Sequence, residues 1–188
     1  MKKLLIATLL SAFALSAQSQ VYVQADLGSS RVALEDEAGG EEVLSGTVFT
    51  QRLSVGYDFQ NNFRVAVDYT NFGKIKNTYS DGYYSADVSL KVKSLGVTGF
   101  YDFKSSSNFT PYVGVRLAHN KADVNVQAYN SYNSVSGSDS VSRIGLGVLG
   151  GVQYKLTNNM ALNANIEYNR LASDAYSAGA NIGLRYNF

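Results

Sequence analysis

The stretch that decides the fold is Ala178-Gly179-Ala180-Asn181-Ile182-Gly183-Leu184-Arg185-Tyr186-Asn187-Phe188. Every second residue in it is apolar, and the residues between are glycine or polar. A strict period of two over this length predicts a β-strand with one apolar face and one polar face. A soluble sheet could carry the same pattern, so the alternation alone does not choose between a soluble and a membrane-spanning protein.

The aromatic end of this strand favours a membrane. The strand closes on Phe188, two residues after Tyr186. Such an ending looks like the signal that the bacterial outer-membrane assembly machinery reads. We therefore expect Ile182, Leu184, Tyr186 and Phe188 to form an assembly signal, and the barrel assembly machinery to be a partner. The alternative is a soluble edge strand that ends on Phe by chance.

The other end of the chain predicts export. Met1-Lys2-Lys3 is basic, residues 4–15 are apolar but too few to span a bilayer, and small residues follow. This order is typical of a secretory signal peptide. We expect residues 1–19 to be removed after Ser19, with a cut after Ala17 as the alternative, and residues 20–188 to form the mature domain. No later run is apolar enough for a transmembrane helix, so an exported β-barrel in the Gram-negative outer membrane agrees with both ends.

Composition narrows the classes of function. The 188 residues suit one domain, and the net charge of +1 with 16% charged residues gives no sign of a nucleic-acid partner. Cysteine is absent, so an exported form must be stable without disulfides, which a closed barrel with many backbone hydrogen bonds can be.

Seven more alternating stretches precede the last one. They lie at about 21–27, 48–59, 63–72, 87–103, 111–118, 144–154 and 162–169. Short turns at 60–62, 104–110 and 157–159 alternate with longer loops at 28–47, 73–86, 122–141 and around 172–175. Short and long connections alternate in this way in outer-membrane barrels. The sequence therefore predicts an all-β protein, an eight-stranded antiparallel transmembrane barrel with four extracellular loops.

The fourth strand breaks the pattern. Val88, Leu90 and Val92 share one phase, whereas Leu95, Val97 and Tyr101 have the other. One explanation is a β-bulge near residues 93–94. The other is that the start of the strand stands above the bilayer, where the face rule relaxes.

Charged residues fix which face meets lipid. A basic residue on the lipid face at mid-bilayer costs roughly 2–4 kcal/mol, and a slip of one residue would turn all the strand charges outward together. We therefore expect an inward-facing network of ion pairs and hydrogen bonds, which we call the lumen network. Its predicted members are Arg52, Arg64, Asp68, Arg116 and Glu167, with Gln24, Asn163 and Asn165 beside them.

Aromatic residues gather at both ends of the predicted strands, as in the aromatic girdles of membrane barrels. Those near the short turns are Tyr57, Phe59, Phe63, Tyr101, Phe103, Tyr112, Tyr154, Tyr186 and Phe188. Those at the other rim are Tyr69, Phe72 and Tyr168.

Several of these strands resemble a known family. Residues 21–26, 64–70, 101–103, 111–117 and 145–149 are similar, in the same order, to the neisserial opacity (Opa) family of opacity-type porins. The resemblance covers nearly every strand of the mature chain. It implies an eight-stranded outer-membrane barrel and surface adhesion to host receptors, proteoglycans or a complement regulator. The loops do not match family loops, so no ligand-contacting residue carries over.

Three functions remain to be weighed. The first is a surface adhesin or host-ligand-binding protein, because the loops supply Tyr79, Tyr83, Tyr84, Tyr129 and Tyr132 amid Ser, Asn and Gly, a composition suited to recognition. The second is a small porin with low passive diffusion, although an eight-stranded barrel has room only for its own side chains. The third is a membrane-embedded lipid hydrolase.

Little in the sequence favours an enzyme. His119 is the one histidine, and its phase places it on the outer rim, as a solvated residue. We see no spacing typical of a metal site or of a nucleophile with its base. We expect no catalytic residue, no metal and no cofactor, and no nucleic-acid partner. Lipid and lipopolysaccharide of the outer membrane are the expected surroundings.

Overall fold

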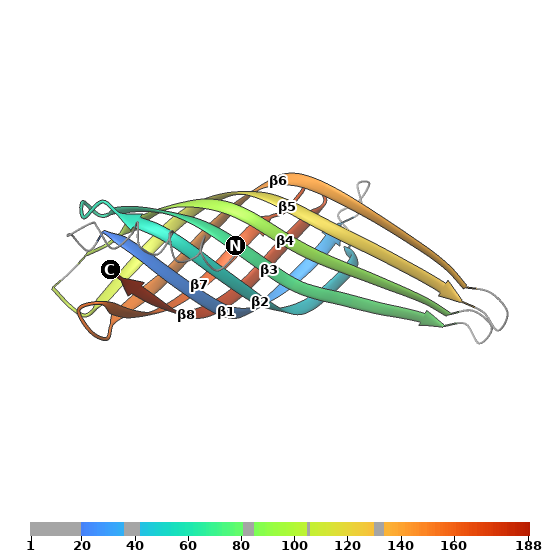
Figure 1. Ribbon diagram of the computed structural model, residues 1–188, viewed down its shortest axis with the longest axis horizontal. Coiled ribbons are helices and arrows are strands. Elements are labelled where there is room, and N and C mark those ends of the chain that lie inside the picture. Colours follow the sequence, from blue (N-terminus) through green and yellow to red (C-terminus); the bar gives the residue numbers. More distant parts are fainter. Residues whose placement is uncertain (1–19, 36–41, 81–84, 105, 130–133) are drawn as a thin grey trace, which may run out of the picture.

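The structure, a computed structural model, describes residues 20–35, 42–80, 85–104, 106–129 and 134–188. In this part of the chain, eight strands form one closed barrel (Figure 1). The strands are β1 (Val21–Glu35), β2 (Glu42–Asp58), β3 (Phe63–Ser80), β4 (Ser85–Asp102), β5 (Phe109–Tyr129), β6 (Ser134–Lys155), β7 (Met160–Arg170) and β8 (Ala175–Asn187). None of the described residues lies in a helix with the length and hydropathy needed to cross a membrane.

The predicted eight-stranded antiparallel barrel is confirmed. Each strand pairs with the next, and β8 returns to β1 over a ladder that runs from Tyr22 opposite Asn187 to Leu34 opposite Ala175. The C-terminal stretch, residues 178–188, therefore contains most of the strand that closes the barrel. Closure leaves no strand edge unpaired in the barrel wall. The predicted signal peptide, 1–19, lies outside the described residues.

The two ends of the barrel differ. At one end, which we call the terminal end, β1 begins and β8 ends, and tight connections at 59–62 and 156–159 join neighbouring strands. At the opposite end, which we call the extended end, β3, β4, β5 and β6 run on well beyond the other strands (Figure 1). We call this four-stranded projection the extension.

The extension has two outer edges without a ladder. The β2–β3 ladder stops at Gln51 opposite Asn71, and the β6–β7 ladder stops at Leu146 opposite Arg170. Beyond these pairs, β3 and β6 keep only one neighbour each, β4 and β5 respectively. The residues of β6 from 137 to 144 are exposed whichever way they point. The extension therefore presents both of its faces there.

The predicted long loops were placed wrongly. Residues 28–35, 42–47, 73–80, 85–86, 122–129 and 134–141 belong to strands, not to loops. The reason is that alternation marks a strand only where its two faces meet different surroundings. In the extension, which contains 73–80, 85–86, 122–129 and 134–141, both faces lie outside the barrel wall, so polar residues occupy both and the period of two disappears. Residues 28–35 and 42–47 instead lie on β1 and β2 of the barrel wall.

The irregular phase of β4 also has a different cause from the predicted bulge near 93–94. The β4–β5 ladder is unbroken from Ser85 to Asp102. The bulge lies on β3, where Phe72 and Gly73 together face Val92, and Gly73 takes a positive φ of 75° that suits glycine. Leu90 and Val92 keep one phase with the inward residues of β4. Both belong to the buried apolar cluster at this level of the barrel, which accounts for an apolar inward phase there. The second explanation, a start that stands above the bilayer, stays a prediction.

The interior changes character along the barrel. In the middle, the buried inward residues are mostly polar or charged, whereas large apolar residues such as Leu53, Val115 and Ile166 face outward and are exposed. At the extended end the interior is apolar instead. There a cluster closes the barrel; its buried members are Val32, Val48, Phe72, Ile75, Leu90, Val92, Leu171 and Ala175.

Two of the aromatic residues assigned to the girdles were placed wrongly. Tyr112 is 3% exposed and Phe72 is 1% exposed, so both point inward. Tyr112 donates a hydrogen bond to Asn163 across the lumen, and Phe72, one of the two residues of the β3 bulge, lies in the apolar cluster. Other predicted girdle residues, including Tyr57, Phe63, Tyr101 and Tyr168, are exposed on the outer wall.

Candidate functional site

The centre of the lumen is built around Asp68 and Arg116. These residues lie on β3 and β5, and both side chains are buried. Arg116 Nη2 lies 2.5 Å from Asp68 Oδ1, and Nη2 also donates to Ser94 at 2.9 Å. Asp68 accepts further bonds from the hydroxyls of Thr70 and Thr98. A buried charge is tolerable only when it is paired and hydrogen-bonded in this way.

Arg52 ties opposite sides of the barrel together. It projects from β2, and its Nη1 lies 2.7 Å from Glu167 Oε2 on β7. Its Nε donates to Thr70 at 2.8 Å and lies 3.7 Å from Asp68 Oδ1. Four of the five predicted members of the lumen network, Arg52, Asp68, Arg116 and Glu167, thus form one connected group.

Arg64 forms a second group nearer the terminal end. Its Nε lies 2.7 Å from Asp102 Oδ2, and its guanidinium stands over the rings of Phe100 and Tyr112 at 4.1 and 4.9 Å. Arg185, from the terminal strand β8, stands over Tyr22 at 3.8 Å and lies 3.4 Å from Asp58. Cation–π contact supports a guanidinium where water is excluded.

Amides and a phenol complete the packing. Asp26 on β1 accepts hydrogen bonds from Gln24 and from Asn163, each at 2.9 Å. Asn163 in turn accepts the Tyr112 hydroxyl hydrogen at 2.7 Å, and Asn165 accepts a bond from Asn181. The predicted neighbours Gln24, Asn163 and Asn165 therefore all lie in the lumen.

Sequence reasoning missed several lumen residues. Tyr22, Asp26, Asp102 and Arg185 are buried and take part in the contacts above. The signal was present in the alternation of each strand. Tyr22 and Asp26 share the phase of the predicted Gln24, whereas Asp102 and Arg185 alternate with the outward aromatic residues Tyr101 and Tyr186 of their own strands.

This packing leaves little free space. The cavity beside Arg52, Asp68 and Tyr112 has a volume of about 20 Å³, which is room for about one water molecule. A larger polar vestibule of about 510 Å³ opens at the terminal end, beside Asp58, Asp102 and Arg185. The ion-paired layer and the apolar cluster both lie between this vestibule and the extended end.

The extended end carries an apolar recess. It has a volume of about 320 Å³ and is lined by Leu90, Val92, Val124 and Leu171, among others, with Asn120, Arg143 and Asp174 contributing polar groups. Asn120 is held in place because its Nδ2 donates to the Leu171 carbonyl at 2.8 Å. An apolar recess with a few fixed polar groups has the composition of a ligand-binding site.

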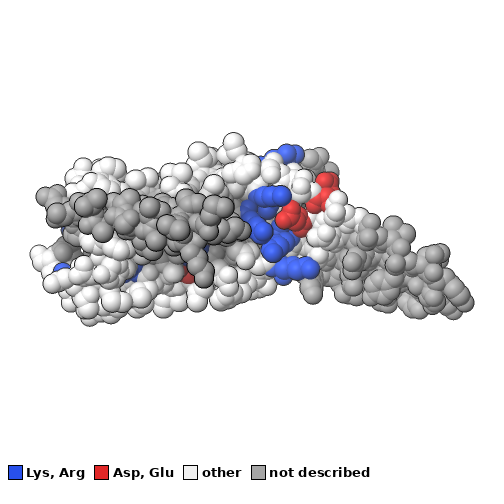
Figure 2. Space-filling view, viewed as in Figure 1, with Lys and Arg blue, Asp and Glu red and all other residues white. Residues whose placement is uncertain are grey.

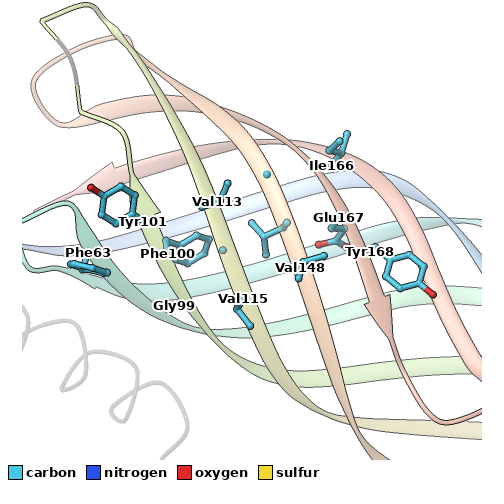
Figure 3. A pocket seen from close by; sticks show the side chains of 13 residues that line it. Phe63, Gly99, Phe100, Tyr101, Val113, Val115, Val148, Ile166, Glu167 and Tyr168 are labelled. Carbon is cyan, nitrogen blue, oxygen red and sulfur yellow. The ribbon is translucent and has the colours of Figure 1, made fainter.

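The outer wall of the barrel is also hollowed. Figure 3 shows Val113, Val115 and Val148 between Phe63 and Tyr101 on one side and Tyr168 on the other. Glycine at position 99 leaves the wall thin there, and the hollow has a volume of about 760 Å³. Its lining is almost wholly apolar, so it suits contact with hydrocarbon chains rather than with a polar ligand.

The loop aromatics fall in two groups. Tyr79 lies near the end of β3, and Tyr129 is the last residue of β5, so the backbone places both far out in the extension. Tyr83, Tyr84 and Tyr132 lie outside the described residues. The β4–β5 ladder pairs Tyr129 with Ser85, and the β3–β4 ladder pairs Tyr79 with Ala86. The backbone of the two hairpins therefore brings Tyr79 and Tyr129 to the same region.

The proposed assembly signal lies along the outside of β8. Ile182, Leu184, Tyr186 and Phe188 are all exposed on the outer wall. The Tyr186 and Phe188 rings meet edge to face with centroids 5.1 Å apart, and the Phe188 amide donates to the Val21 carbonyl at 3.0 Å. The whole signal is therefore presented on one outward face.

His119 lies on the outer rim, as its phase predicts. It is exposed and faces Ile144 and Leu95 on the neighbouring strands. Within the described ranges, no group of three or more His, Cys, Asp or Glu side chains could hold a metal ion.

Comparison with known proteins assigns the chain to a family. A family model described as "Opacity family porin protein" matches residues 55–188. A Haemophilus influenzae protein that carries only the name "uncharacterized protein" is 54% identical over the full length of both chains. The "Protein opa" of the same organism is 35% identical, over 71% of this chain and all of its own.

Two solved structures share the barrel. Neisserial surface protein A is 32% identical with a TM-score of 0.66, over 89% of this chain and 97% of its own. Ail, the attachment invasion locus protein of Yersinia pestis, solved in complex with the heparin analogue sucrose octasulfate, is 18% identical with a TM-score of 0.58, over 90% of this chain and 99% of its own. The second likeness is one of fold alone.

The first testable prediction concerns the lumen ion pairs. Replacing Glu167 by alanine removes the nearest carboxylate of the buried Arg52 guanidinium and leaves it the Asp68 carboxylate at 3.7 Å, so Glu167→Ala should lower the free energy of unfolding by about 3–5 kcal/mol. Urea titration of the refolded barrel in micelles, followed by heat-modifiable gel mobility, measures this. The control is Lys104→Gln, because Lys104 pairs with Asp58 at 3.4 Å but is 38% exposed, and should change stability by less than about 1 kcal/mol. Equal effects of the two variants would contradict the role of the network.

The second prediction concerns assembly. Phe188→Ser removes the ring and keeps the backbone amide that bonds to Val21, so the folded barrel should lose its assembly signal without losing a ladder bond. We expect the amount of heat-modifiable barrel in the outer membrane to fall severalfold. Phe59→Ser, which removes an aromatic ring 52% exposed at the same end, is the control. Similar losses in both variants would show that any exposed ring at this end matters and that the last residue is not a signal.

Proposed function

Because this chain belongs to the opacity family and is an outer-membrane β-barrel of a Gram-negative cell, we propose that it is a surface binding protein that captures host molecules with its extended end. The ligand classes that fit are a host surface receptor, a proteoglycan or a complement regulator. In such barrels the short turns face the periplasm and the longer connections face the outside. The terminal end is accordingly periplasmic and the extension projects from the cell.

One observation carries the proposal, namely the contrast between the packed lumen and the projecting extension. The lumen around Arg52 leaves space for about one water molecule. The extension, in contrast, continues four strands past the barrel wall and exposes both faces of β6 from 137 to 144. Free surface that a ligand can reach is therefore concentrated outside the cell.

The extension gives recognition a rigid support. Binding residues on loops work best when a scaffold positions them, and here the two hairpins, β3–β4 and β5–β6, are joined by a continuous β4–β5 ladder. Tyr79 and Tyr129 mark where this scaffold ends. Tyrosine offers a large contact area at a low cost in side-chain entropy, amid Ser and Asn that form adaptable hydrogen bonds.

The apolar recess adds a second element of recognition. Its volume of about 320 Å³ lies at the low end of the usual range for ligand pockets. The apolar cluster beneath it, which includes Phe72 and Leu90, keeps it separate from the polar lumen. It offers an anchor for an aliphatic or aromatic group of a bound molecule.

The ligand bound in the structure of one neighbour supports a sulfated or carboxylated glycan among the possible ligands. Ail was solved with a heparin analogue. Its likeness to this chain is one of fold, so the support concerns what a barrel of this fold can bind, and no contact residue is transferred.

A small porin is the alternative function, and it predicts a different measurement. An eight-stranded barrel has an interior that side chains fill, and here the ion pairs of Arg52, Asp68 and Arg116 occupy it. Refolded barrel in planar bilayers should therefore show no stable channels. Steady single-channel steps from protein verified as folded would contradict this reading and favour passive diffusion.

Shortening the extension tests the binding proposal. Residues 76–89 and 125–138 can each be replaced by Asn-Gly, because Ile75 pairs with Leu90 and Val124 pairs with Asp139. These replacements leave the apolar cluster in place. Adherence of a non-adherent Gram-negative host that displays the protein to epithelial cells should fall by at least about tenfold, with unchanged levels of folded barrel.

A full-length control separates aromatic contacts from the scaffold. In it the five tyrosines at 79, 83, 84, 129 and 132 become serine, so the strands keep their length. Loss of adherence in this control assigns binding to the tyrosines, and loss only in the shortened variant assigns it to the strands. Undiminished adherence of the shortened variant would overturn the proposal.

A further inference from the structure

A band of lysines lies on the outside of the molecule where the barrel meets the extension. Figure 2 shows Lys and Arg side chains gathered at this level. Four lysines with described side chains make up what we call the lysine patch, Lys74 on β3, Lys91 and Lys93 on β4, and Lys121 on β5. They belong to neither the lumen network nor the apolar recess.

The strand alternation fixes the direction of these side chains. Leu90, Val92 and Ser94 are buried inside, so Lys91 and Lys93 between them point outward. On β3, Ile75 is buried past the bulge and Lys74 is exposed. The patch therefore lies on the same outer surface as the lipid-facing residues.

The patch begins where the apolar band stops. Leu95 is 57% exposed on the outer wall, and Lys93 is the next outward residue of β4. On β5, Lys121 is the next outward residue after His119. Same-face residues of a strand are separated by about 7 Å, so the lysines stand just above the hydrocarbon layer, at the level of lipid headgroups.

The pairing of the lysines points to a missing anion. Lys74 stands directly opposite Lys91, and Lys93 stands directly opposite Lys121. Like charges in directly opposed pairs destabilise a sheet. The cross-strand partners of the four lysines include one carboxylate, that of Asp123, which lies 3.7 Å from Lys121 Nζ. Four lysines against one carboxylate give this set of ladder partners a net positive charge, and further acidic side chains lie beside it on the side of the extension (Figure 2).

We propose that the lysine patch binds the phosphate groups of lipopolysaccharide in the outer leaflet. Three arguments select this occupant: the height of the patch at the headgroup level, the outward direction of the lysines, and their spacing on three adjacent strands, which spans about 10 Å. Each basic residue close to an anionic membrane surface raises the binding affinity by roughly five- to tenfold. The site is independent of the host-binding surface farther out in the extension.

Native mass spectrometry of the full refolded chain in micelles tests the proposal. The probes are bisphosphorylated lipid A, dephosphorylated lipid A, phosphatidylglycerol and sucrose octasulfate. The test variant combines Lys91→Gln, Lys93→Gln and Lys121→Gln. The control combines Lys104→Gln and Lys155→Gln, which remove two exposed lysines at the periplasmic end. Heat-modifiable mobility establishes that each variant is folded.

We expect the wild type and the control to retain bisphosphorylated lipid A, and the patch variant to bind it at least about tenfold more weakly. Dephosphorylated lipid A should bind the wild type no better than it binds the patch variant. In micelles without lipid A the patch variant should unfold at the same or a higher temperature than the wild type, because lysine repulsion is removed. Added lipid A should then raise the unfolding temperature of the wild type only.

Four results would overturn the proposal. The patch variant could retain lipid A as well as the wild type does, or the wild type could bind dephosphorylated lipid A equally well. In the third, sucrose octasulfate would bind through these lysines while lipid A would not, which would assign the patch to a sulfated glycan of the host. Equal retention of phosphatidylglycerol and lipid A would also overturn the assignment, since the patch would then recognise negative charge in general.

Discussion

The structure depends on one constraint, which is that no backbone N–H or C=O group can remain unpaired inside a hydrocarbon layer. The ladder between β1 and β8, from Tyr22 opposite Asn187 to Leu34 opposite Ala175, meets this constraint by closing the sheet. Closure has a consequence for every strand in the wall, because one face must then meet lipid and the other must meet the lumen. The alternation of the last eleven residues is the direct result.

A polar lumen creates the next requirement. With eight strands the interior is narrow, so the inward charges of Arg52, Asp68, Arg116 and Glu167 cannot be left to bulk water and must neutralise one another. The contacts run from β2 to β7 and from β5 to β3, across the barrel rather than along its wall. The side chains that make the lumen compatible with the membrane are thus the same ones that fill it.

Sequence reasoning succeeded where the two faces of a strand differ and failed where they do not. The inward direction of Arg64 and Glu167 could be predicted from the sequence, because a basic or acidic side chain that faces lipid costs free energy. The strand residues beyond about 73 on β3 and before about 142 on β6 were read as loop, since polar residues on both faces carry no period. Phe72 and Tyr112 were assigned to girdles by residue type, although the bulge and the inward phase bury them. The partner of Arg64, Asp102, lies on the adjacent strand β4, and finding it required the β3–β4 register, in which Arg64 stands opposite Phe100.

The molecule therefore has two parts, the barrel wall and the extension, whose residues are under different constraints. In the barrel wall, the position of a residue dictates its type so strongly that few positions remain for binding. Outward positions must be apolar, and the packed ion pairs occupy the inward ones. Past the apolar cluster of Val32, Phe72 and Leu90, that restriction ends, because the strands no longer separate lipid from lumen. The lysine patch lies at this boundary and the apolar recess just inside it, while Tyr79 and Tyr129 lie beyond. Side chains of the extension can therefore change without disturbing how the barrel folds, since the ladders that continue into the extension need only backbone groups.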